Sequence, residues 1–173
     1  MPPISPVVRP EAPHEAARIR LVHEAAFGQT AEADLVDALR AHAVPYLGWV
    51  AEAEGAVVAH VCFSPVQLER APQLRAVGLA PMAVWPTHQR QGIGTALVQA
   101  ALRACRQAGH EVVVVLGHPA YYPRFGFEVA ATKGVICPYL VPPEAFMVLE
   151  LVPGALDQPA GLVQYHAAFN TVV

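Results

Sequence analysis

The stretch "LAPMAVWPTHQRQGIGTALV", residues 79–98, sets the fold of this chain. It begins as an apolar strand, passes a proline, and reaches two glycines two positions apart, Gly92 and Gly94. Apolar residues then recur every three or four positions over 93–108, the spacing of an amphipathic helix. The apolar run "EVVVVLG", residues 111–117, follows as a strand covered on both faces, as in a parallel pair. Strand, helix and strand therefore form one unit that is entered through a glycine-rich turn.

The rest of the chain surrounds this unit with further helices and strands. Thr30 is a candidate cap for the second helix, Glu54-Gly55 the turn of a hairpin, and Gly109 the residue that ends the central helix. Gly78 and Pro81 are unusual inside a central strand and indicate a bulge or a splayed strand there. The pattern predicts an α+β fold with strands at 7–10, 46–68 (a hairpin), 74–84, near 127, 144–152 and 160–169 (an edge strand), and helices at 12–27 and 31–42.

Composition limits the classes of function. The 173 residues are 54% hydrophobic and 14% charged, which is typical of one globular domain, and the net charge is −3. Without a basic run, neither nucleic acid nor a membrane surface is expected as a partner. Three scattered cysteines form no disulfide framework or metal motif. With no export signal and no long apolar run, a cytoplasmic location is expected.

The glycine turn is suited to binding a phosphate. The first amides of a helix lack intrahelical partners, and glycines let an anion approach them without meeting a Cβ atom. Thr95 could add a hydroxyl, and Arg90 or His88 a charge. A plain tight turn is the alternative. A Walker loop is excluded because no Lys follows the glycines, and a dinucleotide fingerprint because Leu97 stands where the third glycine would be.

What remains is Gln89-x-x-Gly92-x-Gly94 after an irregular strand, and this segment resembles the signature of the GNAT N-acetyltransferase superfamily. The stretch "AYYPRFGF" continues the resemblance, with Tyr122 four residues before Gly126-Phe127. The resemblance covers about 7–151, and 152–173 reads as an extension of one domain spanning 1–173. It implies a mixed, mostly antiparallel sheet that is splayed at its centre by a cofactor site and flanked by helices.

The resemblance also implies a cofactor, acetyl-CoA, and residues that bind it. The loop would hold the pyrophosphate, and the backbone of the strand before it would pair with the pantetheine arm. These residues are Gln89, Arg90, Gln91, Gly92, Ile93, Gly94 and Thr95 in the loop, and Met82, Ala83 and Val84 in the strand. No metal is expected.

Acetyl transfer to an amine needs an oxyanion donor, an acid and a base. A backbone amide near Met82 suits the first role. Tyr122 would protonate the departing thiolate, with Tyr121 as the competing tyrosine, because the pKa of a tyrosine, about 10, lies near that of a thiol. His118 is the first candidate base and His60 the second, although either could simply be a structural histidine. The turn after the strand at 111–117 lacks the Asn that many family members carry there.

The acceptor is not specified by the sequence. A small molecule or a peptide with an amine would serve, and a homodimer is compatible with the composition. The alternative function is a non-catalytic acyl-CoA-binding or regulatory module of the same fold.

Overall fold

The structure is a computed structural model, and it describes residues 5–171. The start of the Pro-rich segment and the last two residues of the expected extension lie outside that range. By their contacts the residues divide into two compact units. Unit one holds the described residues up to Phe63, Pro81–Arg103 and those from Ala167, and unit two holds Ser64–Ala80 and Ala104–His166.

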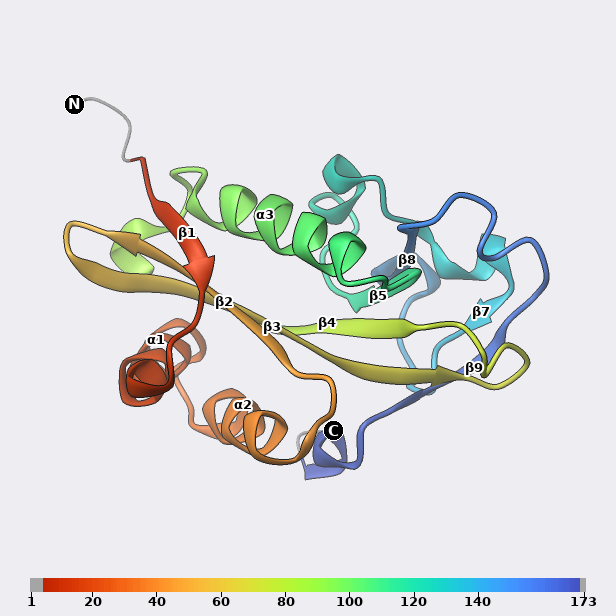
Figure 1. Cartoon of the computed structure of the whole chain (residues 1–173), viewed down its shortest axis with the longest axis horizontal. Coiled ribbons are helices and arrows are strands. Elements are labelled where there is room, and N and C mark those ends of the chain that lie inside the picture. The colour runs from red at the N-terminus through yellow and green to blue at the C-terminus, as the bar shows by residue number, and fades with distance from the viewer. Residues whose placement is uncertain (1–4, 172–173) are drawn as a thin grey trace. The chain divides into compact units, whose positions relative to one another are not determined.

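In unit one, helices cover both faces of a layer of strands. The strand order is β1 (Val7–Pro10), β2 (Leu47–Ala53), β3 (Ala56–Leu68) and the end of β4 (Ala76–Val84). Helices α1 (Ala16–Phe27) and α2 (Ala31–His42) cover one face, and the first turns of α3 (Ile93–Gln107) cover the other (Figure 1). The apolar stripes predicted for these helices supply buried residues, among them Ile19, Val22, Leu35, Leu39, Ile93 and Leu97.

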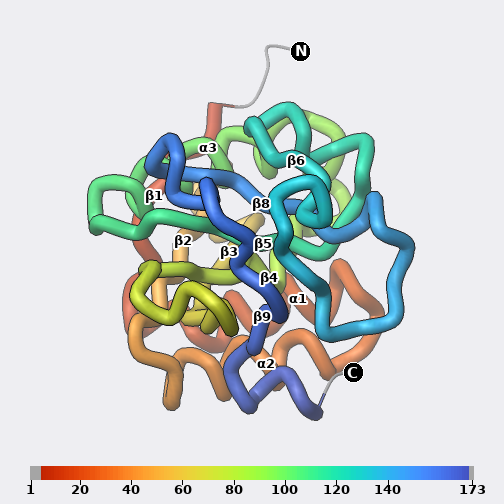
Figure 2. Tube along the Cα trace, turned by 90° about the vertical axis from the view of Figure 1, so that its right-hand side faces the viewer, coloured from red at the N-terminus to blue at the C-terminus, as the bar shows by residue number. Residues whose placement is uncertain are grey.

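In unit two, the start of β4 pairs in parallel with β5 (Val112–Leu116), as the continuous apolar run predicts. Antiparallel β8 (Phe146–Glu150) and then β6 (Glu128–Val129) follow, side by side in Figure 2. The last residues of β3 pair with β9 (Gly161–Tyr165), and β9 in turn pairs with β7 (Val135–Ile136). Short 3₁₀ helices lie at Pro13–Glu15, Pro86–His88, Tyr122–Phe125, Ala130–Lys133, Pro143–Ala145 and Ala167–Thr171.

These observations confirm the expected fold class. Among the described residues, nine strands form a mostly antiparallel open sheet, accompanied by three α-helices. The hairpin turn is where it was predicted, because Glu54 and Gly55 both have positive φ, 54° and 79°. Gly109 likewise has a φ of 88° after α3. The expectation of one domain over 1–173 stays a prediction.

Two local expectations need correction. Thr30 is the N-cap of α2, but its side chain makes no capping hydrogen bond. Strand β9 is not an edge strand, since β3 pairs with one side of it and β7 with the other. Gly78, by contrast, has a packing role in addition to the expected splay: a Cβ there would lie 3.0 Å from Cε1 of Tyr165 and 3.2 Å from Cγ1 of Val66.

Candidate functional site

The loop between β4 and α3 is held by its own polar groups. Its first residue, Trp85, donates its amide to the carbonyl of Val58 on β3 at 2.7 Å. The Gln89 side-chain amide donates to the Val84 carbonyl at 3.0 Å, and that of Gln91 donates to the Thr87 carbonyl at 3.2 Å. These two glutamines therefore brace the turn from inside through their side-chain amides.

Two residues of the loop have left-handed backbones. Gly92 has a φ of 82°, and a Cβ built there would meet no atom within 4 Å. Glycine is thus required by backbone conformation, while the space around it is open. Arg90 has a φ of 62°, which costs a residue with a side chain about 1–2 kcal/mol. Such strain is concentrated at functional sites.

The helix start completes an anion-binding arrangement. Ile93 is buried and anchors the first turn of α3, while residues 89–92 are exposed. The carbonyl of Gly92 accepts the Ala96 amide at 3.0 Å, so Gly92 lies at the first turn of the helix. The helix dipole adds about half a positive charge at this end. Exposed amides, positive potential and a bare glycine suit a phosphate.

Strand β4 runs past the end of its ladder with β5. That ladder begins at Ala76↔Val112 and ends at Leu79↔Val115, whereas β4 continues to Val84. In this last part Met82 and Val84 are half-buried and Ala83 is buried. An extended ligand can pair with the backbone of such a strand as an added strand would.

Tyr122 lies in a cluster of aromatic rings at the start of a 3₁₀ helix. Its ring packs edge-to-face against Tyr121 at 5.2 Å and against Phe127 at 5.7 Å between centroids. Burial raises the pKa of Tyr122 to about 12. This corrects the expectation of an acid matched to a thiol: the phenol stays protonated at neutral pH and is a weaker acid than an exposed tyrosine.

The turn before Tyr122 packs closely against the ring of that tyrosine. A Cβ at Gly117 would collide with the Tyr122 ring, which occupies that space. His118 is exposed, and its carbonyl accepts the amide of Tyr121 at 3.1 Å. Its role as a base stays a prediction.

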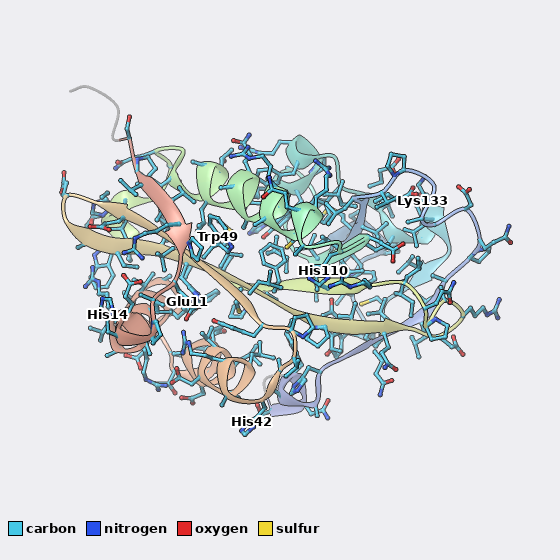
Figure 3. All side chains as sticks on the ribbon, viewed as in Figure 1. Glu11, His14, His42, Trp49, His110 and Lys133 are labelled. Atoms are coloured by element: carbon cyan, nitrogen blue, oxygen red, sulfur yellow. The ribbon has the colours of Figure 1, made fainter. Side chains whose placement is uncertain are left out.

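His60, the second candidate base, is fully buried within a hydrogen-bond network of unit one. Its Nε2 lies 2.9 Å from Oε1 of Glu11, and its Nδ1 lies 2.8 Å from Nε2 of His23. Glu11, which lies between the ribbon of β2 and α1 in Figure 3, also accepts Tyr46 Oη at 2.6 Å and Arg40 Nε at 2.7 Å. His60 is therefore a structural residue that substrate cannot reach.

The protonation states of this network follow from its geometry. Burial alone would raise the pKa of Glu11, but hydrogen bonds from His60, Tyr46 and Arg40 lower it to about 2. A carboxylate only accepts, so His60 Nε2 carries the proton and His60 Nδ1 accepts from His23 Nε2. Burial lowers the pKa of His23 to about 3. Both imidazoles are neutral at pH 7.

Sequence reasoning missed this network, although one signal for it was present. Gly48 lies inside β2, where glycine normally weakens a strand. A Cβ at that position would collide with the carboxylate of Glu11. The glycine marks the point where a side chain distant in sequence crosses the strand.

The residues that the structure describes give little support for a metal site or a membrane-spanning helix. No three His, Cys, Asp or Glu side chains of residues 5–171 gather as metal ligands would. Within the same range, no helix combines the length and the apolar character that crossing a membrane requires.

Comparison with known proteins places the chain in a family. Residues 45–129 match the family model described as "Acetyltransferase (GNAT) domain". The N-acetyltransferase YhbS of Escherichia coli K12 is 40% identical over 165 residues, which cover 95% of this chain and 98% of that protein.

Two solved structures agree with this match. The crystal structure of YhbS from Escherichia coli in complex with CoA superposes with a TM-score of 0.90 at 38% identity and covers 98% of this chain and 94% of that one. A GNAT family acetyltransferase from Brucella melitensis in complex with acetyl-CoA gives a TM-score of 0.78 at 39% identity, covering 95% and 98%. With such similarity over nearly its whole length, this chain belongs to the GNAT family of acetyltransferases and is an acyltransferase.

Proposed function

We propose that this chain transfers the acetyl group of acetyl-CoA directly to an amine, with the loop at Gln89–Thr95 holding the pyrophosphate of the cofactor. The observation that carries the proposal is the backbone of that loop. Gly92 is left-handed, has open space beside its Cα, and directly precedes the N-terminus of α3. Relatives that share the fold at 38–39% identity are described as complexes with CoA and with acetyl-CoA.

The loop residues take separate roles in this proposal. The amides of Gln91, Gly92, Ile93 and Gly94 donate to the phosphates, and Thr95 adds its hydroxyl. Arg90 supplies a positive charge from an exposed position. The side chains of Gln89 and Gln91 keep the turn in shape through the two carbonyls that they bind. Binding therefore depends mainly on backbone groups.

Strand β4 provides the second part of the proposal. Beyond the last rung of its ladder with β5, the backbone of Met82, Ala83 and Val84 pairs with the pantetheine arm as an added strand would. A backbone amide near Met82 stabilises the tetrahedral oxyanion, a contribution of about 10²–10³ in rate.

Tyr122 is the proposed proton donor to the thiolate of CoA. Burial raises the pKa of Tyr122 to about 12, above that of a thiol, so proton transfer from the phenol to the thiolate costs free energy. Tyr122 therefore donates a hydrogen bond to the thiolate before it transfers the proton. His118 remains the candidate base, which an amine like that of lysine needs because only about one molecule in 2,500 is neutral at pH 7. We further propose a cytoplasmic enzyme whose acceptor is a small molecule or a peptide.

The test combines cofactor binding with turnover. Calorimetric titration of the protein with CoA should show binding, and acetyl-CoA with a panel of primary amines should release free thiol. Tyr122→Phe should lower kcat by about a hundredfold or more without changing the Kd for CoA. The matched control is Tyr121→Phe, which removes the adjacent hydroxyl and should keep the rate. CoA binding without thiol release from any amine would mean a non-catalytic module.

A further inference from the structure

Trp85, the first residue of the loop between β4 and α3, is held by contacts with α1 and β3. Its ring lies against the guanidinium of Arg18, with 4.5 Å between Cζ and the ring centroid. Its backbone amide donates to the carbonyl of Val58 at 2.7 Å. Arg18 and Trp85 are both half-buried, which strengthens the attraction between a cation and an aromatic face. The start of the loop is therefore fixed to two other elements of unit one.

A β-bulge supplies the two carbonyls that these residues use. The register between β2 and β3 shifts near the turn of the hairpin, and Val58 is the extra residue on β3. A bulge interrupts the ladder, so its backbone groups can take other partners. The Val58 carbonyl accepts the Trp85 amide, and the carbonyl of Val57 beside it accepts Nε of Arg18 at 2.9 Å. Held at Nε, the planar guanidinium keeps one orientation over the ring.

A second attachment of the loop to the hairpin is weaker. His88 Nε2 lies 4.0 Å from Oε2 of Glu54, whose side chain is 74% exposed. An ion pair of that length and exposure contributes little. The side-chain amides of the two loop glutamines bind carbonyls four or five positions earlier in the chain, so they shape the loop locally. Of these contacts, those of Trp85 hold the loop most firmly to the rest of unit one.

We infer that Arg18 is a positioning residue for cofactor binding, and that it acts through the ring of Trp85. The inference rests on the proposed function, which puts the pyrophosphate on the loop at Gln89–Thr95. A left-handed backbone such as that of Arg90 persists only where the surrounding structure holds the chain, and the stack fixes the chain just before it. A loop that is already ordered loses less entropy on binding, so the stack raises affinity and leaves the reaction unchanged.

The first test is calorimetric titration with CoA. Arg18→Met keeps the apolar stem and removes the guanidinium, so the Kd for CoA should rise about fivefold or more, as expected for a partly desolvated cation–π contact. In turnover assays the loss should appear in the KM for acetyl-CoA, with kcat within about twofold of wild type. Arg20→Met is the matched control, because the same change on the same helix removes ion pairs with Asp34 and Asp37 and should leave the Kd unchanged. An unchanged Kd in Arg18→Met would overturn the inference.

A double-mutant cycle shows whether Arg18 acts through the ring. Trp85→Leu keeps apolar volume and removes the ring, and it should weaken CoA binding about as much as Arg18→Met. The double variant should then bind no more weakly than either single variant, because both changes remove one contact. Trp85→Phe, which restores an aromatic ring, should recover most of the affinity. Additive losses in variants that urea denaturation shows to be folded would overturn the inference, since Arg18 would then contact the cofactor directly.

A measurement without cofactor separates the stack from the proposed function. The chain has two tryptophans, so Trp49→Phe, on β2 (Figure 3), leaves Trp85 as the one fluorescent indole. In that background Arg18→Met should make Trp85 more accessible to acrylamide quenching, whereas Arg20→Met should not. Equal quenching in the two variants would overturn the inference. Failure of the wild type to bind CoA, with quenching as expected, would instead count against the proposed function.

Discussion

The loop at Gln89–Gly94 and the network around Glu11 both belong to unit one and are built in opposite ways. The loop is exposed, uses backbone amides, and tolerates a left-handed Arg90. The network is buried, uses side chains, and joins residues up to 49 positions apart in hydrogen bonds of 2.6–2.9 Å. The difference indicates that the proposed phosphate binding relies on a locally strained turn, while folding stability relies on buried side chains that hydrogen-bond to one another.

The largest effect should come from Gly48→Ala. The new methyl group takes the place of the Glu11 carboxylate, so the buried charge loses its partners. We expect the free energy of unfolding to fall by about 3–5 kcal/mol, measured by urea denaturation. The control is Gly55→Ala, at a φ of 79° with open space, which should cost about 1–2 kcal/mol. Equal losses would show that the network contributes little.

Lowering the pH should weaken the hydrogen-bond network around Glu11 before it changes the loop at Gln89–Gly94. The pKa of His23 is lowered to about 3 in the folded chain, against an ordinary value of 6.5, so the unfolded chain binds one more proton between these values. The free energy of unfolding should therefore fall by about 1.4 kcal/mol per pH unit for this histidine as the pH drops below 6.5. Glu11 adds to the loss between pH 4.5 and about 2.

His23→Gln isolates this contribution, because its amide can still donate to His60 but does not titrate. Urea denaturation at several pH values should give a shallower acid slope than in the wild type. A slope that is unchanged would mean that His23 is charged in the folded protein.

Gly92→Val tests the loop directly. Both stability and cofactor binding should change, because the backbone is left-handed at 82° and the new side chain enters the space assigned to the phosphates. We expect the Kd for CoA to rise at least tenfold by calorimetry, which is about 1.4 kcal/mol. Gly28→Val, at a φ of 71° with equally open space at the end of α1, should lose similar stability and keep the Kd. A normal Kd in Gly92→Val would remove the loop from the cofactor site.

The smallest effect concerns the strain at Arg90. Arg90→Gly relieves a left-handed backbone that costs about 1–2 kcal/mol, although the freer unfolded chain offsets part of the gain. The free energy of unfolding should rise by up to about 1 kcal/mol by urea denaturation. If stability drops instead, the Arg90 side chain holds the loop together and the contrast with the network becomes weaker.

The sequence predicted features that depend on neighbouring residues. The Gln89-x-x-Gly92-x-Gly94 spacing, the Glu54-Gly55 turn and the apolar run at Val112–Leu116 each lie within a few residues, and the structure has all three where expected. Backbone conformation and hydrophobic period are local properties, so a single sequence carries them.

Features that depend on distant partners were not predictable. The sequence did not show that the fold brings Glu11 to His60, or that the ring of Tyr165 lies beside Gly78. The acidity of Tyr122 was misjudged because it depends on burial, which is set by rings from other positions. The roles given to Tyr122, His118 and the loop remain predictions for experiment.

The packing of Tyr165 from β9 beside Gly78 of β4 has a consequence for synthesis of the chain. The ribosome adds Tyr165 long after Gly78, so the space beside this glycine lacks its ring until β9 has been translated. Unit two therefore cannot complete its packing during translation before β9 is made.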